Sequence, residues 1–75
     1  MDVIYIHDER GIHRTYGEIE LDIKKRYRIN LMNRLDGYEI GKEYRVDLPS
    51  ERVVFIGYLS SDGKTIVECM EMSKS

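Results

Sequence analysis

The 75-residue sequence contains no alanine and no glutamine, which are both good helix formers. Isoleucine, valine and tyrosine are frequent instead, and these side chains suit the pleated surface of a β-sheet. The composition therefore favours strands over helices along the chain.

Residues that bind metals or form cross-links are also scarce, since the chain has one cysteine, Cys69, and two histidines, His7 and His13. One thiol cannot form an internal disulfide, and these three residues are too few for the usual closed zinc site. Cys69 lies in an apolar stretch without a basic neighbour, which indicates a buried structural thiol rather than a nucleophile. We expect a hydrophobic core without a metal or a cofactor.

Long apolar runs are absent as well. No segment approaches the roughly 18 apolar residues of a membrane span. The N-terminal sequence MDVIYIHDER lacks the apolar stretch of a signal peptide. These features predict a cytoplasmic protein without a membrane association. The formal net charge of −2 argues against a strongly cationic nucleic-acid-binding protein, although a local basic patch still acts within a Debye length of about 8–10 Å.

Turn signals divide the sequence at regular intervals. Three segments end in glycine and are flanked by β-rich sequence, which predicts hairpins: DERG at 8–11, RLDG at 34–37 and SSDG at 60–63. The single proline, in DLPSER, marks another break between residues 48 and 52. We expect one domain over residues 1–72 and a frayed tail at 73–75.

The segment from residue 17 to 37, GEIELDIKKRYRINLMNRLDG, turns from acidic to basic, as a helix suited to its own dipole would. Its apolar residues nevertheless alternate: they fall on odd positions between 19 and 31, and every even position from 18 to 30 is polar. Period two predicts a strand, and only Lys25 interrupts it. Such a strand would be roughly 50 Å long, whereas a domain of this size is about 30 Å across, so it must bend or divide.

These patterns predict an all-β fold, a small antiparallel five-stranded barrel of OB or SH3-like type. The alternative is an open antiparallel sheet with one short helix at 18–26. The strands expected for the barrel lie near 2–7, 12–33 (bent or divided), 38–48, 52–59 and 64–72.

The hairpin predicted at 34–37 would pair the basic run KKRYR, at 24–28, with residues 43–47 of the following strand. Three cross-strand pairs follow from that hairpin: Arg28 with Glu43, Lys24 with Asp47, and Arg26 with Arg45. The first two would form a charge ladder on a solvated face, worth about 0.2–1 kcal/mol per pair. The third places like charges side by side, an arrangement that a bridging anion would stabilise.

A candidate site for nucleic acid or another anion follows from this arrangement, because guanidinium groups bind phosphates and aromatic rings stack on bases. Its members are Arg26, Arg28, Tyr44, Arg45 and Tyr58.

The first and the last of the three hairpins bear on catalysis and on the core. In the first, His7 pairs with Ile12, and the two histidines point to opposite faces, so a shared metal or acid–base site is disfavoured. In the last, pairing of Leu59 with Lys64 would place Ile56 opposite Val67 as core. Met70 and Met72 would form an adaptable contact surface or fill core.

The sequence predicts a non-enzymatic binding module, with no catalytic residues. The leading hypothesis is a protein-interaction or accessory protein, because a small β domain offers sheet edges to a partner strand or to a second copy. The alternative is a weak single-stranded RNA- or DNA-binding protein. A small hydrolase built around His7 or His13 is a remote third hypothesis. No motif is specific enough to indicate a family.

Overall fold

All regular structure in the described part of the chain, residues 1–22 and 24–72 of a computed structural model, is β-strand. The strands are β1 (Asp2–Asp8), β2 (Gly11–Leu21), β3 (Tyr27–Leu31), β4 (Glu43–Leu48), β5 (Val53–Leu59) and β6 (Thr65–Met72). The expectations for Ile23 in the alternating strand and for a frayed tail at 73–75 lie outside the described residues.

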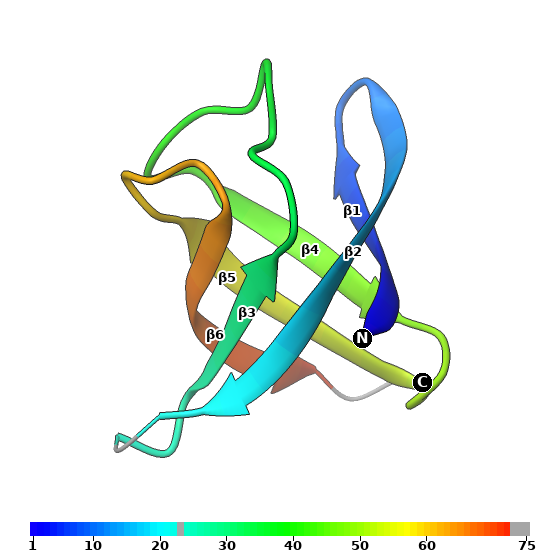
Figure 1. Cartoon of the computed structure of the whole chain (residues 1–75), viewed down its shortest axis with the longest axis vertical. Coiled ribbons are helices and arrows are strands. Elements are labelled where there is room, and N and C mark those ends of the chain that lie inside the picture. Colours follow the sequence, from blue (N-terminus) through cyan, green and yellow to red (C-terminus); the bar gives the residue numbers. More distant parts are fainter. Residues whose placement is uncertain (23, 73–75) are drawn as a thin grey trace.

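The strands close into an antiparallel barrel in the order β1-β2-β3-β6-β5-β4 (Figure 1). The prediction of a small all-β antiparallel barrel is confirmed. The barrel has six strands rather than five because the strand expected at 12–33 divides into β2 and β3. Residues 18–21 belong to β2, so the helix of the alternative fold is not formed there. The closed barrel has no open sheet edge, so a partner strand cannot add to the sheet in the way that the sequence analysis expected.

The chain reverses between β2 and β3, at the point where Lys25 interrupts the alternation of apolar and polar residues. The Asp22 carboxylate oxygen Oδ1 accepts hydrogen bonds from the backbone N–H groups of Lys24 and Arg26, at 2.9 and 3.0 Å. Lys25 adopts a left-handed conformation with φ of 60°, which a regular strand does not contain. The predicted strand therefore divides at a tight turn, and its halves pair with each other from Gly17–Leu31 to Leu21–Tyr27.

The segment that joins β3 to β4 differs most from expectation. RLDG at 34–37 does not close a hairpin, and the strand expected at 38–48 begins only at Glu43. Residues 32–42 instead form a loop at the end of the barrel that also carries the β1–β2 and β5–β6 turns (Figure 1). Leu35 is buried in this loop, and its N–H donates to the Gly63 carbonyl at 2.8 Å. An apolar side chain thus plugs this end of the barrel.

Aromatic contacts fix the same loop against the first hairpin. The Arg10 guanidinium lies 4.7 Å from the centre of the Tyr38 ring, and the Tyr38 and Tyr44 rings meet edge to face at 5.3 Å. Arg10 also pairs with Asp8 at 3.0 Å. The loop is therefore held from both the β1–β2 hairpin and β4.

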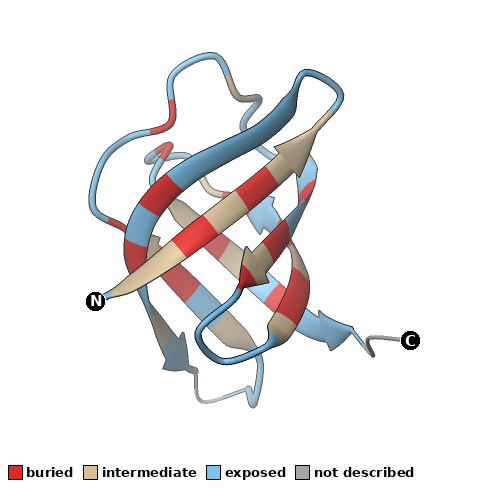
Figure 2. Cartoon of the chain, turned by 90° about the vertical axis from the view of Figure 1, so that its right-hand side faces the viewer, coloured by how far each residue is buried: buried red, intermediate tan, exposed pale blue. Residues whose placement is uncertain are grey.

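Buried and exposed positions alternate along the strands, and the buried ones line the inside of the barrel (Figure 2). The core cluster consists of Ile4, Ile6, Ile29, Leu31, Leu35, Tyr44, Val46, Leu48, Phe55, Leu59, Ile66 and Cys69. The prediction of a buried Cys69 is confirmed. No helix in the described residues is long and apolar enough to cross a membrane.

Candidate binding surface on β5 and β6

The pairing predicted for the basic run is wrong, because β3 and β4 are not neighbours. Two strands lie between them in either direction around the barrel. The pairs Arg28–Glu43, Lys24–Asp47 and Arg26–Arg45 are therefore not formed. Instead Arg28 pairs with Glu20 of β2, and Arg45 lies between His7 of β1 and Ile56 of β5.

Tyr44 cannot serve as a stacking platform for a ligand. Its side chain belongs to the core, the residue is only 3 % exposed, and its hydroxyl accepts a hydrogen bond from the Glu39 N–H at 2.9 Å. Of the five residues proposed for the site, this one lies inside the barrel.

The remaining four lie on or beside the outer surface of β5 and β6. Two cross-strand pairs define this surface: Tyr58 with Val67, and Ile56 with Met70. Met72 continues it along β6, since alternate residues of a strand share a face. Met70 is 63 % exposed, and Tyr58 and Met72 are each 41 % exposed. We call the set Ile56, Tyr58, Val67, Met70 and Met72 the β5–β6 outer face.

A β-bulge in β6 creates this face. Between Val67 and Met70 the strand contains one residue more than its partner β5, and Glu68 there has a φ of 56°. The hairpin at 60–63 is confirmed, but its register is wrong: Leu59 pairs with Ile66 rather than with Lys64. As a result Val67 lies outside the barrel instead of in the core. No pattern in the sequence marks this bulge, and strict alternation would place Val67 and Cys69 on one face.

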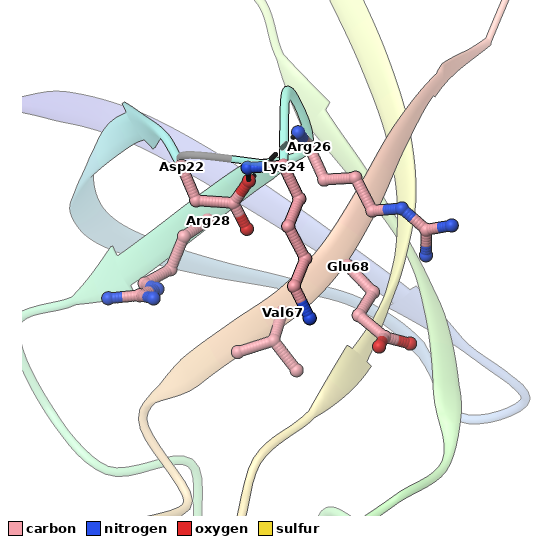
Figure 3. A pocket seen from close by; sticks show the side chains of 6 residues that line it. All are labelled: Asp22, Lys24, Arg26, Arg28, Val67 and Glu68. Atoms are coloured by element: carbon pink, nitrogen blue, oxygen red, sulfur yellow. Dashed lines mark hydrogen bonds between the residues drawn. The ribbon is translucent and has the colours of Figure 1, made fainter.

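Cationic side chains border the face on the β3 side (Figure 3). Arg26 and Met70 line one groove of about 380 Å³, together with Lys24, Lys25 and Glu71 among others. Arg28 and Val67 line a second groove of about 530 Å³, which Lys24 and Arg26 share with the carboxylates of Asp22 and Glu68. In Figure 3, Arg26 and Arg28 extend to opposite sides of Lys24. The cations thus form a strip along the turn rather than a single convergent site.

The β3-side cations have no ion pair within the described part of the chain, unlike Lys42 and Arg45. Lys42 lies 2.7 Å from a Glu9 carboxylate oxygen, and Arg45 lies 3.7 Å from an Asp47 oxygen. Lys24, Arg26 and Arg28 have no such carboxylate among the described residues. Their charge is therefore directed to solvent or to a ligand.

The histidines are separated as expected. The predicted pairings of His7 with Ile12 and of His13 with Ile6 are confirmed. His7 Nε2 lies 3.0 Å from Asp47 Oδ2, whereas His13 packs against the Tyr38 ring at 5.7 Å. The described residues contain no group of three or more His, Cys, Asp or Glu side chains that could hold a metal ion.

The Cys69 thiol is not poised for reaction. Burial raises its pKa to about 12, against the smaller lowering effect of a hydrogen bond with the Ile29 backbone. At neutral pH the sulfur is therefore a protonated thiol, which is a poor nucleophile.

Comparison with protein-family models, with curated proteins and with solved structures found no match to this chain.

Proposed function

We propose that this barrel is a non-enzymatic binding module that holds a short segment of a partner protein on the β5–β6 outer face. One observation carries the proposal: apolar side chains gather on the outside of two adjacent strands whose inner positions already fill the core. Contiguous exposed apolar surface of this kind marks interaction sites.

The size of the face favours a segment over a folded domain. It lies on two adjacent strands about 4.8 Å apart and covers about 14 Å along them, at about 3.4 Å per residue. A stable interface between domains draws on roughly 20–30 residues from each partner, many more than the residues of this face. A peptide-like segment matches it better.

The chemistry of the face also suits a protein ligand. Met70 and Met72 have flexible, polarizable side chains that adapt to different apolar groups. Tyr58 adds a ring with a polar tip, a combination enriched at protein interfaces. The non-enzymatic part of the proposal depends on the separation of His7 from His13 and on the burial of Cys69.

The test is a selection of random linear peptides displayed against the immobilised protein, followed by affinity measurements on two variants. Met70→Asp places a charge on the proposed face. Ile12→Asp is the matched control, because Ile12 is 65 % exposed on β2, the strand opposite β5 in the barrel order. We expect selected peptides to bind the wild type and Ile12→Asp equally, and Met70→Asp at least tenfold more weakly. Failure to enrich peptides, or binding that is lost only in Ile12→Asp, contradicts the proposal.

A second candidate function, weak binding of single-stranded nucleic acid, is favoured by the strip of Lys24, Arg26 and Arg28. Exposed cations in a row suit the backbone of a polyanion. Val67 lines the same groove, and Tyr58 is its cross-strand partner on β5. With Tyr44 in the core, only one of the two tyrosines first considered can stack on a base. A protein segment therefore remains the leading proposal.

The nucleic-acid candidate is tested by heteronuclear NMR titration with a mixed pool of single-stranded RNA and DNA at low and moderate salt. Shifts at residues 24–28 that fade as salt rises support it, because phosphate contacts depend on counterion release. A spectrum that stays unchanged at low salt rules it out.

A further inference from the structure

We infer that the partner segment is an amphipathic α-helix that lies along β5 and β6, with its apolar residues at positions i, i+3, i+4 and i+7. The inference rests on the proposed function and specifies the conformation and the sequence pattern of the ligand. It follows from the closure of the barrel and from the length and make-up of the β5–β6 outer face.

The backbone of the two strands has little to offer an extended segment. β5 pairs with β4 on one side and with β6 on the other, and β6 also pairs with β3. An extended peptide that joins a sheet gains its affinity from main-chain hydrogen bonds to a free strand edge. On the outer face it would lose its conformational freedom without gaining those bonds.

A helix brings its own main-chain hydrogen bonds. Its N–H and C=O groups pair within the segment, apart from those at its two ends. It therefore needs only apolar contact from the barrel along one side. Ile56, Val67, Met70 and Met72 supply that contact, and among the five residues of the face only Tyr58 carries a hydroxyl.

The spacing of the outward residues matches the repeat of a helix. Outward residues of a strand recur about every 6.8 Å, and a helix returns to the same side after four residues, about every 6 Å. The face has three levels: Tyr58 with Val67, Ile56 with Met70, and Met72. Together they cover about 14 Å, which corresponds to about nine residues of helix. Apolar residues at i, i+3, i+4 and i+7 thus fall over successive levels.

The side chains of the face suit the uneven surface of a helix. Each cross-strand pair joins a long side chain with a shorter one, Tyr58 with Val67 and Met70 with Ile56. Helix side chains project in rows, so they pack over the short residues and beside the long ones. The methionines adjust to what they meet, because their thioether side chains are unbranched and flexible.

A second copy of this chain does not supply such a helix. All regular structure in residues 1–22 and 24–72, the described part of the chain, is β-strand. Contact between two copies through this face alone would also involve far fewer residues than the roughly 20–30 per side of a stable interface. The occupant is therefore a helical segment of a different protein.

The experiment compares two patterned display libraries on the immobilised full chain, with peptides of about 12 residues, near the lower limit for an isolated helix. The helix library varies positions i, i+3, i+4 and i+7 among Leu, Ile, Met and Phe. The strand library varies positions i, i+2, i+4 and i+6 in the same way, which places them on one side of a strand. All other positions carry the same mixture of Ala, Glu and Lys, so composition and charge are matched. We expect the helix library to enrich at least tenfold over the strand library.

Affinities of the best peptide from the helix library, measured by fluorescence anisotropy, provide the second arm. Proline in place of a central alanine on its polar side keeps every apolar residue but breaks the helix, and should weaken binding at least tenfold. Met70→Asp should weaken the unmodified peptide at least tenfold as well. Ile12→Asp, on β2, is the matched control and should leave its affinity unchanged. Amide spectra of each variant confirm that it folds.

The outcomes separate this inference from the function on which it rests. If peptides from the random selection depend on Met70 but the strand library enriches as well as the helix library, the binding face stands and the helical conformation is wrong. The same conclusion follows if the proline peptide binds as tightly as its parent, or if neither patterned library yields a peptide that depends on Met70. If the random selection also yields none, the proposed function falls as well.

Discussion

Replacement of Gly57 by alanine tests the packing that creates the β5–β6 outer face. Gly57 lies in β5 opposite the bulge of β6. A Cβ atom added there would lie 2.6 Å from Cys69 Sγ, 2.8 Å from Ile66 Cγ2 and 2.9 Å from the Val67 carbonyl oxygen. All three distances are shorter than real Cβ contacts, and the last involves backbone that cannot move without disturbing the pairing of β5 with β6.

The expected cost is at the upper end of the range for overpacked cores. Such substitutions typically destabilise by about 1–3 kcal/mol, and here two strands must separate locally to admit one methyl group. For a domain of this size, about 3 kcal/mol lowers Tm by roughly 12–24 °C. We expect urea unfolding of Gly57→Ala to show a free energy of unfolding about 3 kcal/mol lower than that of the wild type, and thermal unfolding to show the corresponding decrease in Tm.

Two further variants show whether the clash is the cause. Gly41→Ala is the control, because nothing lies within 4 Å of its added Cβ and only its φ of 78° disfavours a side chain, at roughly 1–2 kcal/mol. The double variant Gly57→Ala/Cys69→Ala lacks the sulfur atom that the added Cβ would meet first. Its loss in free energy of unfolding should therefore be at least about 1 kcal/mol smaller than the sum of the losses in the two single variants. A Gly57→Ala protein within about 0.5 kcal/mol of the wild type would refute the described packing.

Three more predictions concern other parts of the fold. Leu35→Ala should cost about 2–4 kcal/mol in urea unfolding, because Leu35 plugs the end of the barrel, and a smaller loss than 1 kcal/mol would contradict that role. Hydrogen bonds, of which that from the Ser60 hydroxyl has the largest effect, lower the pKa of the Asp62 carboxyl. The ionised carboxylate therefore stabilises the fold above about pH 4, and this stabilisation is lost as the pH falls. Asp62→Asn should therefore flatten the drop in Tm between about pH 4 and pH 2, and an unchanged slope would count against it. The Cys69 thiol, whose pKa burial raises to about 12, should react with a disulfide reagent at the rate of unfolding, and fast labelling in native buffer would show that it is accessible.

Local patterns in the sequence were sufficient to predict the strands outside the segment 38–42, which was expected to begin β4 and forms a loop instead. The alternation around residues 19–31 depends only on which side chains face the core, and the break at Lys25 reflects a backbone conformation that a strand cannot continue. The first hairpin was predicted in register because its turn fixes both strands.

Long-range pairing could not be predicted in the same way. RLDG resembles a hairpin turn, yet its burial of Leu35 at the end of the barrel depends on β5 and β6, which come later in the chain. The bulge at Glu68 reverses which residues of β6 face outward, and nothing nearby in the sequence indicates it. Arg26 and Arg45 are both exposed, but the pairing predicted for them is wrong, because two strands lie between β4 and β3 in either direction.

The most direct test of the β5–β6 outer face as a binding surface is a heteronuclear NMR titration of the labelled chain with a peptide selected by display against the immobilised protein. We expect the shifts to fall on amides of residues 53–59 and 65–72, with smaller changes at 24–28 and 45, and to be absent along β2. Shifts that follow β2, or a spectrum that does not move at millimolar peptide, would contradict the assignment of this face as the binding surface.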